Sequence, residues 1–399
     1  MLASSIASRL AFALSFSACL AVAAAACGGD GVLAETGDAG PTSSPRTDGG
    51  VSAKGDGSTP VDSSDAPDAS ADAATDAAPT ALPITAPAGA WTFVPIAGMV
   101  CGDGSPTGIS VNPSATPGAP LFVFLMGGGA CWSDLTCLNN AADNVNQTVD
   151  GPAIAADIAR LPLLFDRTRA DGAFRDASFV FVPYCTGDLH AGNARRDYQF
   201  LTKKMTIEHR GARNVEAFLP RLAATFRAPK VVLAGASAGG FGALLNYHRF
   251  RAAFATARID ILDDSGTPIQ PTGSFWPDMQ SAWNLTLPAS CTGCAASAPA
   301  VLAYLDAQMG PAGRLALLSY TQDQTIRSFT GNLVPALFEA DLGTLRSGMA
   351  ARQRMFYVSG TSHVLTNKSP PPTTQAGLDV ATWLQQFASD DPAWAHQGP

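Results

Sequence analysis

Residues 230–247, KVVLAGASAGGFGALLNY, are the stretch that decides the fold. A short run of β-branched and apolar residues, 230–234, leads into Gly235-Ala-Ser237-Ala-Gly239, which is a G-x-S-x-G motif. A helical pattern, residues 240–253, follows the motif. In this context the serine stands on a sharp strand-to-helix turn, where small neighbours let the strand and the helix pass closely. We therefore predict that Ser237 is a nucleophile; the alternative is a purely structural turn.

Other short apolar runs surround this unit, and each ends in glycine, cysteine or polar residues. With helical patterns between them, such runs predict strands of a mostly parallel sheet that is buried on both faces. The predicted fold class is α/β, an α/β-hydrolase-like sheet with helices on both faces. Functional groups of such sheets collect just past the carboxyl ends of the strands. The further predicted strands are residues 119–126, 178–184, 259–262, 315–320 and 355–358, and the further predicted helices are 213–226 and 378–388.

A serine nucleophile needs a base, and the chain has five histidines. In α/β-hydrolases the chain order is serine, acid, histidine. His363 fits this order, because it follows the last predicted strand in a Gly/Ser/Thr loop. We predict that His363 is the base; the alternative is a histidine of a surface loop. The other histidines are His190, His209, His248 and His396.

The acid should lie between Ser237 and His363, just after a strand. Asp323 follows residues 315–320 with two residues between, and we predict that it is the acid. Such a carboxylate holds the imidazole tautomer and stabilises the imidazolium ion. Asp264, which follows the preceding predicted strand, is the alternative acid.

Gly127-Gly128-Gly129 follows an earlier predicted strand and resembles the glycine-rich oxyanion loops of esterases. We predict an oxyanion hole formed by the N–H groups of Gly128, Gly129 and Ala238. A simple turn and a phosphate cradle are the alternatives, although no Gly-Lys-Ser/Thr follows to support a nucleotide loop.

The first 26 residues predict a signal peptide, because Arg9 precedes an unbroken run of apolar and small residues. Ala24-Ala25-Ala26-Cys27 resembles a lipobox, which predicts a lipid on Cys27; an ordinary signal peptide is the alternative. Residues 27–85 have almost no large apolar side chains, so they predict a disordered tether rich in Ala, Asp, Ser and Pro. Residues 86–399 predict one catalytic domain.

Six cysteines lie in this domain, and an even number in an exported protein predicts disulfides. Cys131/Cys137 and Cys291/Cys294 are close enough to pair locally, and Cys101/Cys185 then pair by elimination. Half of a zinc site at Cys291 and Cys294 is the alternative, but no second Cys or His pair accompanies it, so we expect no metal.

The net charge of −8 comes mainly from the predicted tether. Residues 1–85 hold ten of the 33 acidic residues but only three of the 25 basic ones, so the domain is close to neutral. No basic patch indicates nucleic acid. We expect an exported monomer that touches the membrane only through the lipid on Cys27. The expected location is the cell envelope, at the outer membrane, and a secreted protein is the alternative.

Five blocks in order resemble the pectin acetylesterase/Notum family of carboxylesterases. They span about residues 100–365: Cys101-Gly-Asp-Gly-Ser-Pro106, Gly127-Gly-Gly-Ala-Cys131-Trp with Cys137, Val182-Pro-Tyr-Cys185-Thr-Gly-Asp188, Gly235-Ala-Ser237-Ala-Gly-Gly240 with Asp264-Ser-Gly266, and Ser362-His363. The resemblance implies an α/β-hydrolase with a Ser-Asp-His triad, places the acid at Asp323, and implies ester hydrolysis without metal or cofactor.

The chain departs from the family pattern in two regions that shape the acyl pocket. Ala130 stands where the family has an aromatic residue, with Trp132 two places later, and the later cysteine-rich region is reduced to Cys291 and Cys294. The expected substrate is therefore an acetyl ester of a saccharide or an ester of a longer acyl chain. A thioesterase or peptidase on the same fold, and a lipid-tethered binding protein without activity, are the rival hypotheses.

Overall fold

The computed structural model describes residues 82–139 and 141–398. The predicted signal peptide, Cys27 and nearly all of the predicted tether lie outside these residues. Ile84 is buried, and its N–H donates to Thr225 Oγ1 at 2.7 Å. The folded part therefore begins before residue 86, slightly earlier than the sequence-based boundary. None of the described helices is long and apolar enough to cross a bilayer.

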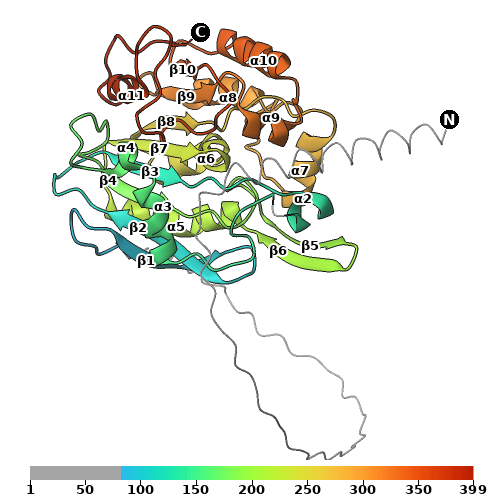
Figure 1. The fold of residues 1–399 in the computed structure, drawn as a ribbon. Coiled ribbons are helices and arrows are strands. Elements are labelled where there is room, and N and C mark those ends of the chain that lie inside the picture. The colour runs from blue at the N-terminus through green and yellow to red at the C-terminus, as the bar shows by residue number, and fades with distance from the viewer. Residues whose placement is uncertain (1–81, 140, 399) are drawn as a thin grey trace, which may run out of the picture. The chain divides into compact units, whose positions relative to one another are not determined.

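An eight-stranded sheet organises the described chain, with strand order β1-β2-β4-β3-β7-β8-β9-β10 (Figure 1). β1 and β2 are antiparallel to their neighbours, and the strands from β4 to β10 pair in parallel. The carboxyl ends of the six parallel strands therefore meet at one edge of the sheet. The strands are β1 Thr92–Val100, β2 Pro106–Asn112, β3 Leu121–Leu125, β4 Ser178–Val182, β7 Lys230–Ala236, β8 Arg258–Asp264, β9 Leu315–Tyr320 and β10 Gln353–Val358.

Alternating side chains of the parallel strands enter two separate hydrophobic cores. In β3, for example, Leu121, Val123 and Leu125 belong to one core, and Phe122 and Phe124 belong to the other. Because both faces are covered, each strand is apolar along its whole length instead of alternating with polar residues.

Helices cover both faces, as predicted. One core receives side chains of α5 Gly211–Thr225, α6 Ala238–Ala253 and α8 Ala300–Gln308. The other receives side chains of α3 Gly151–Ala159, α4 Pro162–Phe165 and α11 Val380–Ala388. The predicted α/β-hydrolase-like fold class is thus confirmed, and the six strands and three helices predicted from the sequence all exist. The remaining helices are α2 Asp134–Leu138, α7 Phe275–Trp283, α9 Gln324–Thr330 and α10 Pro335–Ser347.

Four strands were not predicted from the sequence: β1, β2 and the two strands of a separate antiparallel hairpin, β5 Ala194–Phe200 and β6 Lys203–His209. The hairpin is anchored on two helices: Gln199 N–H donates to Asp134 Oδ1 at 2.8 Å, and Arg196 donates to Ser281 O at 2.8 Å. Its strands are mostly exposed and charged, so they lack the apolar runs that marked the central strands.

The structure contains all three predicted disulfides, Cys101–Cys185, Cys131–Cys137 and Cys291–Cys294. The zinc alternative at Cys291 and Cys294 is therefore wrong for this oxidised state, because joined sulfur atoms are not thiolate ligands. Cys101–Cys185 closes 84 residues of chain and ties the segment after β1 to the segment after β4.

Candidate active site

Ser237 stands between β7 and α6 on a strained turn. Its φ of +54° and ψ of −120° are rare for any residue except glycine, and such strain costs on the order of 1–3 kcal/mol. The flanking glycines make the turn possible. A Cβ atom on Gly235 would lie 2.1 Å from Gly239 O, and one on Gly239 would lie 1.9 Å from Leu125 O. The motif is thus a sharp elbow that presents Ser237 at the carboxyl edge of the sheet.

His363 and Asp323 come from loops after β10 and β9. His363 Nδ1 lies 2.7 Å from Asp323 Oδ2, and Asp323 is fully buried. Asp323 Oδ1 accepts from Ile326 N–H at 3.0 Å and caps α9, so the carboxylate is fixed on its other side as well. An ionised carboxylate can only accept here, so Nδ1 carries the proton and Nε2 is the basic nitrogen.

The elbow serine and the imidazole are not hydrogen-bonded to each other. His363 Nε2 is buried and has no hydrogen-bond partner among the described residues, and the side chain of Ser237 does not cap the first turn of α6. The two residues nevertheless follow strands of the same parallel set, in the order β7, β8, β9, β10. Hydrogen bonds of catalytic groups are often long before substrate binds.

The glycine loop, residues 127–129 after β3, lies against the elbow, because β3 is the neighbour of β7. A Cβ atom on Gly127 would lie 3.0 Å from Ser237 Cβ. Gly128 and Gly129 have φ values of +147° and +70°, which favour glycine. Within the described chain, the N–H groups of Gly128, Gly129 and Ala238 donate no hydrogen bond. These donors are available for a ligand oxygen.

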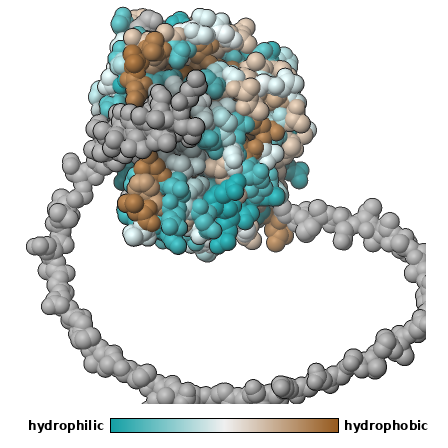
Figure 2. Space-filling model, turned by 90° about the vertical axis from the view of Figure 1, so that its right-hand side faces the viewer, coloured by the Kyte–Doolittle hydropathy of each residue, from teal (hydrophilic) through white to brown (hydrophobic). Residues whose placement is uncertain are grey.

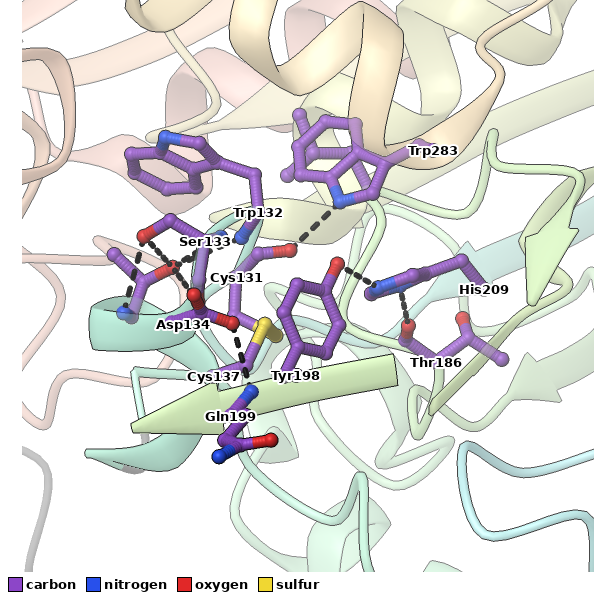
Figure 3. Close-up of a disulfide and its surroundings, with 12 residues drawn as sticks. Cys131, Trp132, Ser133, Asp134, Cys137, Thr186, Tyr198, Gln199, His209 and Trp283 are labelled. Atoms are coloured by element: carbon purple, nitrogen blue, oxygen red, sulfur yellow. Dashed lines mark hydrogen bonds between the residues drawn. A yellow bond between two sulfur atoms is a disulfide. The ribbon is translucent and has the colours of Figure 1, made fainter. Parts of the chain in front are cut away.

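The two ends of the glycine loop are held by hydrogen bonds that could not be predicted from the sequence. Met126 O accepts from His190 Nε2 at 2.8 Å. Cys131 N–H donates to Gly187 O at 3.0 Å, and Trp283 Nε1 donates to Cys131 O at 2.7 Å (Figure 3). These bonds link segments far apart in the chain, so no local pattern could reveal them.

Next to the loop, Cys131, Cys137 and His209 form a buried cluster whose ligand atoms lie within 4.8 Å of one another. The cluster is not arranged to hold a metal ion. The two sulfur atoms are joined, and His209 contacts Tyr198 OH at 2.8 Å and Thr186 O at 2.7 Å through its two ring nitrogens (Figure 3). Burial lowers the pKa of His209, which favours the neutral imidazole.

Asp264, the alternative acid, has a different set of partners from Asp323. Its carboxylate accepts hydrogen bonds from Leu365 and Thr366, which follow the histidine in the chain. Burial raises the pKa of Asp264, and these hydrogen bonds oppose the rise. The imidazole is therefore supported by Asp323, and Asp264 supports the backbone beside it.

A wall of four aromatic side chains stands beside the elbow. Trp132 lies 5.5 Å from Phe275 and 5.5 Å from Phe329, and Phe329 lies 5.7 Å from Phe241, between ring centroids. Phe241 is in the first turn of α6, where its N–H donates to Ser237 O. Phe241 and Phe329 also line an apolar cavity of about 20 Å³, which is room for about one water molecule.

Figure 2 shows the molecule from the side of α7 and α9 in Figure 1, with apolar patches separated by hydrophilic surface. The large apolar side chains that are exposed in the described chain come from three separate parts of the sequence. They are Leu82, Phe200, Leu201, Leu333, Val334 and Leu337.

A family described as Pectinacetylesterase matches residues 88–283, which include Ser237 and the glycine loop. The palmitoleoyl-protein carboxylesterase notum2 of Xenopus laevis is 30% identical over 158 residues, which are 39% of this chain and 30% of that protein. The human palmitoleoyl-protein carboxylesterase NOTUM is 26% identical over 175 residues, 42% of this chain and 34% of that protein. The matched segment thus spans about a third of these relatives.

Among solved structures, the Wnt deacylase Notum from Drosophila superposes with a TM-score of 0.56 over 76% of this chain and 95% of that chain. The sequence identity is 17%, so this comparison concerns the fold.

Proposed function

Because this chain belongs to the pectin acetylesterase/Notum family, we propose that it is a serine carboxylesterase that removes acetyl groups from an O-acetylated saccharide. The observation that carries the proposal is the hydrogen bonding of the two ring nitrogens of His363. Its Nδ1–H is held by the buried Asp323, and its buried Nε2 has no partner in the described chain. An imidazole oriented in this way is prepared to accept one proton.

The mechanism follows from these positions. His363 Nε2 takes the Ser237 Oγ proton while Oγ bonds to the ester carbonyl carbon. The carbonyl oxygen becomes an oxyanion, which accepts hydrogen bonds from the N–H groups of Gly128, Gly129 and Ala238. The imidazolium then gives its proton to the leaving alcohol as the C–O bond breaks. Water attacks the acyl-enzyme with His363 as base again, which releases the acid and restores Ser237.

A panel of acyl esters, thioesters and amides, together with a fluorophosphonate probe, tests this proposal. We expect hydrolysis of p-nitrophenyl acetate and labelling of Ser237. Hydrolysis of amides or thioesters alone would assign the chain to a rival hydrolase class. Absence of both labelling and turnover would favour the binding-protein hypothesis.

The size of the apolar cavity supports an acetyl rather than a long acyl group. We propose that the acyl group enters this cavity, because Phe241, which lines it, lies in the first turn of α6 directly after Ser237. Its volume of about 20 Å³ favours an acetyl group, and a fatty chain requires Phe241 or Phe329 to move.

We predict that Phe329→Ala shifts the preference toward longer acyl chains, because it removes one side of the wall. The ratio of kcat/KM for p-nitrophenyl octanoate to that for p-nitrophenyl acetate should rise by about tenfold or more, the factor that a few methylene groups in a pocket supply. Phe226→Ala is the matched control, since Phe226 is a partly buried phenylalanine that packs on the same core but does not line the cavity. An unchanged ratio in Phe329→Ala would show that another region sets acyl length.

We also propose export to the cell envelope with a lipid on Cys27. The three disulfides support an oxidising compartment. The Cys27→Ser variant should move from the membrane fraction to the soluble fraction, and mass spectrometry of the wild-type N-terminus should find a diacylglyceryl group on Cys27. A wild-type chain that is processed without a lipid would mean that the segment is an ordinary signal peptide.

A further inference from the structure

Asp264, at the end of β8, holds the loop that carries the histidine. Leu365 N–H lies 2.9 Å from Asp264 Oδ1 and 3.0 Å from Oδ2. Thr366 donates to Oδ2 twice, from its backbone N–H at 2.8 Å and from its hydroxyl at 2.7 Å. The carboxylate is fully buried, so these charge-assisted bonds form away from water.

Ser265 forms a further hydrogen bond to the residue next to His363. Its hydroxyl accepts from Val364 N–H at 3.2 Å and donates to Asp264 Oδ1 at 3.1 Å. Val364 has a φ of +58°, which is a true outlier for a β-branched side chain. Such a conformation persists only where its surroundings fix it.

The same turn is bonded to the elbow and to the strand that precedes the acid. Ser237 N–H donates to Asp264 O at 2.8 Å, and Ser265 N–H donates to Leu318 O at 2.9 Å in β9. One turn of the chain therefore contacts the nucleophile through its main chain and the histidine loop through its side chains.

We propose that Asp264 is a positioning residue, which aims His363 Nε2 at Ser237 by fixing the backbone of residues 364–366. This inference rests on the proposed function. The positioning role of Asp264 requires hydrogen-bond acceptors, whereas the role of Asp323 requires a negative charge next to the imidazole. Asp264 therefore acts through the histidine loop and touches no reacting atom.

Thr366→Val is the sharpest test, because valine has nearly the shape of threonine and removes one donor to Asp264. We expect kcat on p-nitrophenyl acetate to fall by about tenfold, the effect of losing a hydrogen bond to a charged group, with KM within about twofold. Thr382→Val is the matched control, since the Thr382 hydroxyl donates to Asp379 at 2.9 Å at the start of α11 in the same way. The control should retain the wild-type kcat.

Asp264→Asn and Asp264→Ala separate positioning from acid catalysis. Asparagine keeps the shape and one acceptor oxygen, so Asp264→Asn should stay within about tenfold of the wild-type kcat, whereas Asp264→Ala should lose about a hundredfold. A loss of a thousandfold or more in Asp264→Asn would overturn the proposal in favour of an essential charge at this position.

Proton NMR gives a readout that does not depend on turnover. The low-field His363 Nδ1–H resonance should broaden or move in Thr366→Val and stay in place in Thr382→Val. If wild type is active and both Thr variants match it in kcat and in this resonance, the positioning role is wrong while the proposed function stands. If the wild-type protein hydrolyses no ester, the proposed function is wrong. In that case the His363 Nδ1–H resonance still tests the inference, because an unmoved resonance in Thr366→Val would contradict the positioning role independently of activity.

Discussion

The Ser237→Ala variant should lose about 100,000-fold to a millionfold in kcat on p-nitrophenyl acetate, the cost of deleting the nucleophile of a triad. Without the Oγ atom no acyl-enzyme forms, and water cannot replace the hydroxyl on the strained elbow. The fold should remain, because alanine tolerates the turn as well as serine does and the Ser237 side chain makes no capping hydrogen bond to α6. Turnover and thermal unfolding of the purified variant measure the two effects.

A matched control for this variant is Ser389→Ala, at an exposed position after α11. It should keep the wild-type turnover and the wild-type labelling by a fluorophosphonate. Substantial turnover in Ser237→Ala would refute the proposed mechanism, since no other residue is assigned to form the acyl bond.

Asp323→Asn should lower kcat by about 1,000- to 10,000-fold with little change in KM. The amide cannot accept the Nδ1–H as a carboxylate does, and it favours the tautomer that places the proton on Nε2 of His363, where it blocks catalysis. The variant isolates this effect, because asparagine is as good a helix N-cap as aspartate and can still accept from Ile326 N–H. Steady-state kinetics together with Tm measure the loss of activity against the loss of stability.

Comparison with Asp264→Asn makes the prediction for Asp323 specific. The two carboxylates are both buried and lie at the carboxyl ends of neighbouring strands, Asp264 as the last residue of β8 and Asp323 just after β9. A general effect of removing a buried charge should therefore appear in both variants. A large loss in Asp264→Asn and a small loss in Asp323→Asn would reverse the assignment of the acid.

Much of the fold could be predicted because the sequence patterns of its central strands are local. The strand runs are apolar along their whole length, since both sheet faces are covered, and their boundaries in the structure differ from the predicted ones by a few residues. The hairpin β5–β6 escaped prediction because its exposed strands carry charged residues and bury few side chains. β1 and β2 were not predicted because each contains a proline and a glycine, residues that weaken a strand pattern.

The sequence could nominate residues for the candidate site, but it could not predict their contacts. Asp264 and Asp323 both lie between the serine and the histidine in the chain and at the carboxyl ends of predicted strands. Only their hydrogen-bond partners distinguish them. The supports of the glycine loop, His190 and Trp283, carry no motif of their own. They became visible only through contacts between distant segments.

By itself, the sequence determined the elbow, the parallel strands and the two short-range disulfides, because these depend on the sterics of neighbouring residues and on closing very small loops. Tertiary structure decided which carboxylate faces the imidazole, how Asp264 grips the loop beyond it, and how little space the aromatic wall leaves. Those are distances between segments far apart in the chain, since Asp264 and Leu365 are 101 residues apart and Trp132 and Phe329 are farther apart still. The packing of helices on both faces of one sheet sets these distances.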